Sequence, residues 1–269
     1  MVNEYVRPAS LEEALELMED DGSVASAGGT FLLTGYEVGR GRDMDCMIDV
    51  LQLLPSGVTR SGNELSIGSG TTFQALIDSK DAPACLKAAA LSMANRNTRN
   101  RATVGGNLGA NKACASLPPI LLALGAKVEF KARASAPLTL DLDKWLAAPE
   151  GLVLRVIVPM APGTLAAAGR ASRTACDLAT ATVGVSYRLE NGVIRGLRVA
   201  LGGFSPHARL FPDLAALFEG TALPPKADIE RVAKPLLTAI SDHRGSADYK
   251  KQRGAVILAD AMHAAEALS

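Results

Sequence analysis

Apolar and polar residues follow two different periods along the first part of the chain. The segment LEEALELM (residues 11–18) repeats apolar residues three or four positions apart, behind Ser10 as a candidate N-cap and with Glu13 at the capping-box position. This pattern predicts a helix. Short alternating or β-branched runs predict strands at SVAS, MDCMIDV and ELSIGSG, and two more short helices are predicted at TFQALIDS and ACLKAAALSMA.

The middle of the chain continues this mixture of short elements. SLPPILLALG (residues 116–125) has Pro near its start and Gly at its end, which is typical of a short helix. AKVEFKA and GLVLRVIVP predict strands, and LDLDKWLA predicts a short helical element. MAPGTLAAAG (residues 160–169) then combines Pro, Gly and small residues. We therefore predict two domains, residues 1–165 and 166–269.

The second half of the chain has a different pattern. Two β-rich runs between residues 180 and 203 are joined at Asn191-Gly192, which is a strong signal for a two-residue hairpin turn. The rest is largely helical, with predicted helices at LFPDLAALFEG, KADIERVAKPLLTAI and YKKQRGAVILADAMHAAEAL. Strands followed by helices predict a small α+β domain.

Composition excludes several classes of function. The chain has 28 basic and 28 acidic residues, so its balance argues against a protein built to bind nucleic acid or an anionic membrane. The N-terminus lacks the pattern of a signal peptide, and no run reaches the roughly 20 apolar residues of a membrane span. The four cysteines are far apart and form no C-x-x-C pair, which argues against a metal or iron–sulfur site. We expect a cytoplasmic protein with reduced thiols.

Two glycine-containing segments are the candidates for ligand binding. The first glycine segment is Ala27-Gly28-Gly29-Thr30, and the second is Thr103-Val104-Gly105-Gly106-Asn107. Neither contains G-x-G-x-x-G or a Walker motif. Consecutive glycines can adopt positive φ and point successive N–H groups at phosphate oxygens, and the side chains of Thr30, Thr103 and Asn107 could add hydrogen bonds. Tight turns without any ligand are the alternative interpretation.

Four stretches, in order along the chain, resemble one family. They are ASAGGTFLL, RNRATVGGNLGANKACASLPPILLALGAKVEF, RTACDLATATVGVSYRLENGVIRGLRVALGGFSP and RGSADYKKQRGAVILADAM. Together they resemble the FAD-binding medium subunit of the molybdenum hydroxylases, the family of xanthine dehydrogenase and carbon monoxide dehydrogenase. The resemblance implies an α+β fold: a PCMH-type FAD-binding domain of two α/β subdomains, then a small C-terminal α+β domain with an antiparallel sheet and helices.

The resemblance also implies which residues bind FAD. They are Ala27, Gly28, Gly29 and Thr30 of the first glycine segment, and Thr103, Gly105, Gly106 and Asn107 of the second. Asp177 falls at the Asp that opens the C-terminal domain in the family. A position near the flavin is one interpretation of Asp177; a helix cap or an ion pair with Arg173 is the other.

Three positions differ from the family pattern. Phe31 stands where Asp usually follows Gly-Gly-Thr, and Ser116 where Asp commonly precedes Leu-Pro-Pro. Lys112-Ala113 replaces the common Asp-Pro. We expect Phe31 to pack in the core. Lys112 could neutralise a diphosphate or lie in solvent.

The resemblance implies a flavin electron-transfer subunit of an oxidoreductase complex. Its partners would be a large subunit with a molybdenum cofactor and a small [2Fe-2S] subunit, and its acceptor would be NAD, oxygen or another oxidant. No catalytic residue and no metal ligand is expected on this chain. The alternatives are a scaffold subunit that has lost productive FAD binding, and a stand-alone flavin-dependent reductase.

Overall fold

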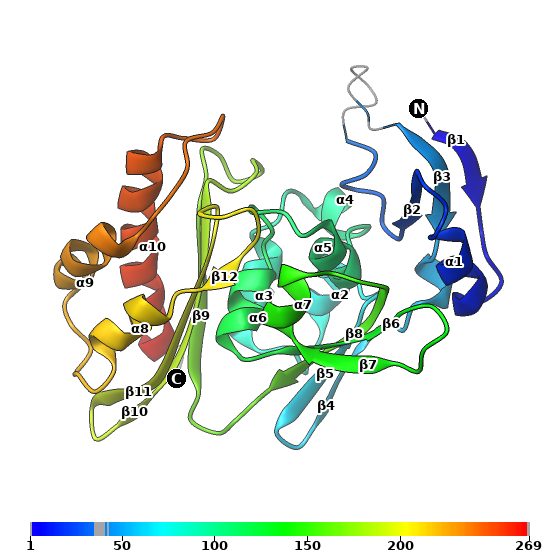
Figure 1. Cartoon of the computed structure of the whole chain (residues 1–269). Coiled ribbons are helices and arrows are strands. Elements are labelled where there is room, and N and C mark those ends of the chain that lie inside the picture. The colour runs from blue at the N-terminus through cyan, green and yellow to red at the C-terminus, as the bar shows by residue number, and fades with distance from the viewer. Residues whose placement is uncertain (1, 35–40, 42, 268–269) are drawn as a thin grey trace.

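The computed structural model describes residues 2–34, 41 and 43–267, and a small parallel sheet forms its N-terminal end (Figure 1). Its strand order is β1-β3-β2, and helix α1 follows β1 in the chain. Ser10 caps α1 by accepting a hydrogen bond from the Glu13 backbone N–H, as predicted, whereas the Glu13 carboxylate accepts from the backbone N–H of Ala9. The elements are β1 (Val2–Val6), α1 (Leu11–Leu17), β2 (Ser23–Ser26) and β3 (Met44–Asp49).

A five-stranded antiparallel sheet forms the second subdomain. Its order is β4-β5-β8-β6-β7, so β8 returns from the end of the predicted flavin domain to the centre of the sheet. The predicted helical element at residues 140–147 is divided between the end of β7 and the whole of α7 (Leu142–Ala147). The strands are β4 (Val58–Ser61), β5 (Glu64–Gly68), β6 (Lys127–Lys131), β7 (Leu138–Asp141) and β8 (Leu152–Pro159).

Short helices build the hydrophobic core of this subdomain with the sheet. Phe73, Trp145 and Leu108 are fully buried among the strand residues. Every residue of α6 is buried, because the C-terminal sheet covers the helix as well. The helical elements are the 3₁₀ turn η2 (Leu51–Leu53), α2 (Phe73–Asp78), α3 (Ala84–Leu91), α4 (Arg96–Arg99), α5 (Val104–Ala110) and α6 (Pro118–Ala123).

The C-terminal part is a four-stranded antiparallel sheet with order β12-β11-β10-β9. In Figure 1 the sheet stands between α10 on one face and α3 and α6 on the other. The hairpin turn is confirmed, since Asn191 and Gly192 have φ of 53° and 76°, as a type I′ turn requires. The elements are β9 (Leu165–Ala171), β10 (Ala181–Glu190), β11 (Val193–Gly202), β12 (Arg209–Leu210), α8 (Pro212–Phe218), α9 (Lys226–Ala233), η3 (Lys234–Leu236) and α10 (Ala247–Ala267).

Strand β9 begins at Leu165, and the exact domain boundary stays a prediction. Among the helices that the structure describes, none is both long enough and apolar enough to cross a bilayer.

Backbone contacts fix the C-terminal sheet on α6. A Cβ atom at Gly184 of β10 would lie 2.4 Å from the backbone of Pro119, so only glycine permits this approach. The Ser186 hydroxyl donates to the carbonyl of Ala123, and the Arg198 guanidinium donates to the carbonyl of Leu122 at 2.9 Å. These carbonyls lie in the last turn of α6, and the Leu122 carbonyl also accepts from the backbone N–H of Gly125. The C-terminal domain thus completes the end of this helix.

A buried ion pair anchors the start of α10. Lys250 is only 1% exposed, and its Nζ lies 2.8 Å from Asp242 Oδ2. Burial of the Asp242 carboxyl opposes its ionisation, but hydrogen bonds from Lys250 and from the Arg244 backbone N–H outweigh that cost and lower its pKa to about 2. The Thr180 hydroxyl donates to the Arg244 carbonyl, so the same turn also supports the start of β10.

We predict that Asp242→Asn lowers the free energy of unfolding by about 2 kcal/mol near pH 7, because it leaves the Lys250 charge without a counterion. The folded pKa of Asp242 lies below the unfolded value of about 3.9, so the stabilisation is complete above pH 4 and is lost as the pH falls toward 2. Urea unfolding of the wild type and the variant at pH 7, 4 and 3 measures this difference.

Asp228→Asn is the control, because Asp228 pairs with Arg231 on the surface and its loss should cost less than about 0.5 kcal/mol. A difference between wild type and Asp242→Asn that is as large at pH 3 as at pH 7 would contradict the ion-pair explanation.

Candidate functional site

The first glycine segment forms a tight turn after β2. Gly29 has φ of +69°, as expected for a glycine that reverses the chain, and the Leu33 N–H closes one helical turn on the Gly29 carbonyl at 3.0 Å. The backbone N–H groups of Gly28, Gly29 and Thr30 donate to no residue that the structure describes. Successive unpaired donors of this kind can bind an anion.

Gly28 is required for packing rather than for its φ angle. A Cβ atom at this position would lie 2.0 Å from the carbonyl oxygen of Arg101. In return, the Arg101 guanidinium Nε donates to the Gly28 carbonyl at 3.3 Å. Because Arg101 lies two residues before Thr103, these contacts bring the first glycine segment against the beginning of the second.

The second glycine segment is the N-terminus of helix α5, and our prediction of a loop with positive φ was wrong there. Thr103 is the N-cap, and its hydroxyl accepts from the Gly106 N–H at 3.0 Å. The Gly105 N–H donates to Ser69 O at 2.8 Å, and the Asn107 N–H donates to Thr103 O. The predicted set of free donors is therefore absent from Gly105, Gly106 and Asn107, because packing already uses these groups.

The side chains of the second segment hold neighbouring elements in place. A Cβ atom at Gly105 would lie 2.7 Å from the Ser69 Cβ, so glycine lets α5 sit against the end of β5. Asn107 Oδ1 accepts from the Leu117 N–H at 3.3 Å, immediately before α6. Thr103 is buried. In this structure these residues position the first segment, in which the N–H groups of Gly28, Gly29 and Thr30 donate to no described residue.

The sequence in and beside the two segments contains basic residues and no acidic ones. Residues 22–34 and 91–117 contain no Asp or Glu, whereas the second range contains Arg96, Arg99, Arg101 and Lys112. Arg99 donates to the carbonyls of Met93 and Ala94 and so completes the turn after α3. Arg101 and Lys112 are exposed beside the first glycine segment. Their charges favour an anionic ligand at that place.

Two of the positions that differ from the family pattern contact each other. Lys112 Nζ lies 4.9 Å from the ring centroid of Phe31. Our expectation that Phe31 packs in the core was wrong, since 45% of the residue is exposed. Ser116 is half-buried before α6. The contact joins the end of α5 to the first glycine segment across 81 residues of chain.

Asp177 forms an ion pair with Arg173 at 3.2 Å, which was one of its two predicted roles. Its backbone carbonyl accepts from Arg170, a residue that also donates to Ser92 O at 2.7 Å. Burial lowers the pKa of the Arg170 guanidinium, and Asp177 opposes that shift. Arg170 thus ties the loop of Asp177 to the end of α3. In the described part of the chain, no hydrogen bond or ion pair joins Asp177 to a glycine segment.

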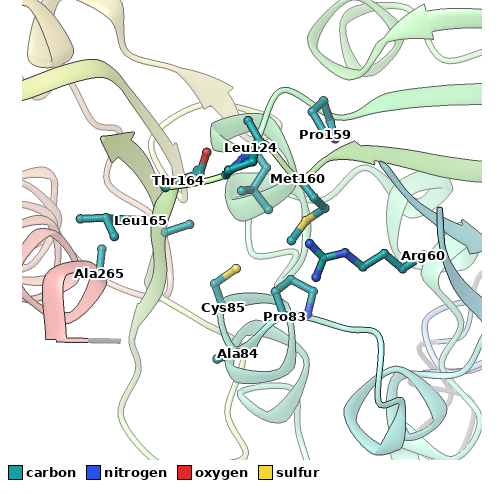
Figure 2. A pocket seen from close by; sticks show the side chains of 14 residues that line it. Arg60, Pro83, Ala84, Cys85, Leu124, Pro159, Met160, Thr164, Leu165 and Ala265 are labelled. Carbon is teal, nitrogen blue, oxygen red and sulfur yellow. The ribbon is translucent and has the colours of Figure 1, made fainter. Parts of the chain in front are cut away.

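A separate cavity of about 340 Å³ lies where the two domains join. Figure 2 shows Arg60 extending toward Met160 and Pro83, with Cys85 nearby. Burial raises the pKa of the Cys85 thiol to about 11, so the thiol stays protonated near neutral pH. None of the predicted site residues lines this cavity. Nor do the described residues contain a cluster of three or more potential metal ligands.

The comparisons with known families identify the ligand class. Residues 1–161 match the FAD binding domain in molybdopterin dehydrogenase, and residues 166–265 match the CO dehydrogenase flavoprotein C-terminal domain. This chain belongs to the molybdopterin dehydrogenase flavoprotein family. FAD is accordingly its cofactor, and the chain is a FAD-binding oxidoreductase subunit of the molybdenum hydroxylase type.

Several relatives in this flavoprotein family match over nearly the whole chain. Protein YgfM of Escherichia coli (strain K12) is 30% identical over 97% of this chain and 95% of its own length. The nicotine 6-hydroxylase medium subunit of Paenarthrobacter nicotinovorans is 30% identical over 91% of each chain. The solved carbon monoxide dehydrogenase of Hydrogenophaga pseudoflava matches with a TM-score of 0.88 at 27% identity, covering 98% of this chain and 97% of that chain.

We predict that Gly28→Ala and Gly105→Ala each lower the free energy of unfolding by about 1–3 kcal/mol, because the new methyl groups would collide with Arg101 and Ser69. Gly109→Ala is the matched control. Gly109 lies in the same helix α5, and no atom lies within 4 Å of a Cβ built there. Alanine should stabilise the chain at that position by up to about 1 kcal/mol.

Urea unfolding of the three variants measures these changes. If Gly28→Ala were as stable as Gly109→Ala, the close approach of the first glycine segment to Arg101 would not be a constraint on the fold, and the same result for Gly105→Ala would remove the constraint between α5 and Ser69.

Proposed function

We propose that this chain is the flavin subunit of a cytoplasmic molybdenum hydroxylase-type complex. In that complex it receives electrons from a small [2Fe-2S] subunit, which takes them from a large subunit with a molybdenum cofactor. It passes them to NAD, oxygen or another acceptor. Relatives that are named medium subunits or medium chains of such dehydrogenases support this role. Residues 1–165 would form the flavin domain and residues 166–269 the domain that completes it.

One observation carries the assignment of the site. The unpaired N–H groups of Gly28, Gly29 and Thr30 lie beside the Arg101 and Lys112 side chains, with no carboxylate in either segment. A diphosphate needs donors together with positive charge, so these residues fit the most strongly charged part of FAD. Ala27 continues the same turn, while Thr103, Gly105, Gly106 and Asn107 hold it in place.

FAD, when bound, supplies the electron-transfer chemistry, and this chain has to bind and orient it. The glycine segments contain no group that could act as a general acid or base, as expected for a subunit that only passes electrons. The Arg170 hydrogen bonds hold the loop of Asp177 against the end of α3, where it could limit access of water to the flavin. In this proposal Asp177 does not bind the flavin directly, and its loop shields the flavin from water.

We predict that the natively purified complex contains about one FAD per copy of this chain. An absorption spectrum before and after heat release measures the flavin, and affinity purification identifies chains that carry molybdenum and iron. Reduction of the flavin, followed by anaerobic mixing with NAD or with oxygen, identifies the acceptor from the rate of reoxidation. A colourless complex whose chain takes up no added FAD would favour the scaffold subunit. Activity of the isolated chain on a small substrate would favour the stand-alone reductase.

A further inference from the structure

The contact between Lys112 and Phe31 places a positive charge at the edge of the first glycine segment. The ammonium lies 4.9 Å from the centre of the ring, and the ring itself is largely open to solvent. Within the described part of the chain, Lys112 forms no ion pair with a carboxylate. Its charge is therefore compensated only by the π face of Phe31, which is a weak interaction at an exposed site.

The backbone of Lys112 is held in place by its neighbours. Asn111 ends α5 in a left-handed conformation with φ of 44°, and its side-chain amide donates to the Leu146 carbonyl at 2.9 Å. The Lys112 carbonyl accepts from the Ala115 N–H at 2.9 Å. The base of the lysine is therefore fixed, whereas its side chain is exposed and contacts the Phe31 ring.

The first glycine segment lacks any charge of its own. Arg101 approaches it from one side through the Gly28 carbonyl, and Lys112 approaches it through Phe31. The unpaired N–H groups are those of Gly28, Gly29 and Thr30, so they belong to the same short stretch of chain that Arg101 and Lys112 contact. A ligand with two negative charges would gain a charge-assisted hydrogen bond from the lysine, which is stronger than the contact with the ring.

We propose that Lys112 binds the FAD diphosphate and that Phe31 is a positioning residue, which holds the ammonium beside the first glycine segment until the ligand arrives. This inference rests on the proposed function, because it takes FAD to be the ligand. It assigns a binding role to two side chains that replace carboxylate positions of the family pattern. A plain alternative is that Lys112 only stabilises the C-terminus of α5 through the helix dipole.

The test is FAD binding by the full chain after removal of its flavin, followed by the change in flavin fluorescence. We expect Lys112→Gln to raise the Kd for FAD on the order of 10-fold at low salt, as loss of a charge-assisted hydrogen bond does. The effect should shrink as salt rises, since screening weakens the same charge in the wild type. Lys112→Arg should restore affinity to within about threefold, because the charge remains. Phe31→Leu should give an intermediate Kd and keep the salt dependence.

Three comparisons separate a role of Lys112 in binding from a role in the stability of the fold. Lys80→Gln is the matched control, since Lys80 is another exposed lysine of the same domain, and it should leave the Kd unchanged. Riboflavin carries no phosphate, so its affinity should be the same for wild type and Lys112→Gln. Thermal unfolding without flavin should give the same Tm for both proteins, whereas a helix-dipole role would lower the Tm of the variant.

The outcomes distinguish this inference from the proposed function. If the wild type binds FAD and Lys112→Gln has the same Kd and salt dependence, or weakens riboflavin equally, the role of Lys112 is overturned while the flavin subunit stands. If the wild type binds no FAD at any salt concentration, the proposed function fails, and the inference fails with it.

Discussion

Helix α6 is the constraint on which the rest of the molecule depends. It is buried along its whole length, because the C-terminal sheet covers one side and helices α3 and α7 of its own domain pack against it as well. Ser186 and Arg198 of the C-terminal sheet donate to the carbonyls of Ala123 and Leu122 in its last turn, and Leu122 also accepts from the Gly125 N–H. The glycine at position 184 allows the two backbones to come close enough for these bonds. The two domains therefore share buried hydrogen bonds as well as apolar packing at this helix.

A short series of contacts connects this core to the binding site and fixes the position of the site. Asn107 of α5 bonds to the chain just before α6, and the first turn of α5 bonds to the end of β5. Arg101, immediately before α5, then packs on Gly28. In the first turn of α5 the N–H groups of Gly105 and Gly106 donate within the protein, while Asn107 Oδ1 accepts from Leu117. The N–H groups of the second glycine segment are thus used in hydrogen bonds that position the first segment. The N–H groups of the first segment remain unpaired among the described residues and can donate to a ligand.

Local signals in the sequence predicted local structure well. The Ser10 cap and the Asn191-Gly192 turn depend on neighbouring residues alone, so both could be read directly. Strand β1 was missed because its middle residues are exposed and show no alternation. Strand β9 was missed because its small residues resemble a linker, although α10 packs against it closely at Gly169. The glycine segments were found, but their division into a donor turn and a supporting helix depends on residues distant in the sequence, such as Ser69 and Arg101.

Contacts between residues that are distant in the sequence also decide how the positions that differ from the family pattern are interpreted. Taken one at a time, Phe31, Lys112 and Ser116 indicate lost carboxylates, which weakens the case for a flavin. The structure shows that Phe31 and Lys112 are in contact, so two of the changes act at one place. Removing carboxylates from the neighbourhood of a diphosphate removes repulsion, and adding a lysine adds attraction. Phe31 and Lys112 together therefore leave a site that is more favourable to a dianion, and this strengthens the physical argument for FAD.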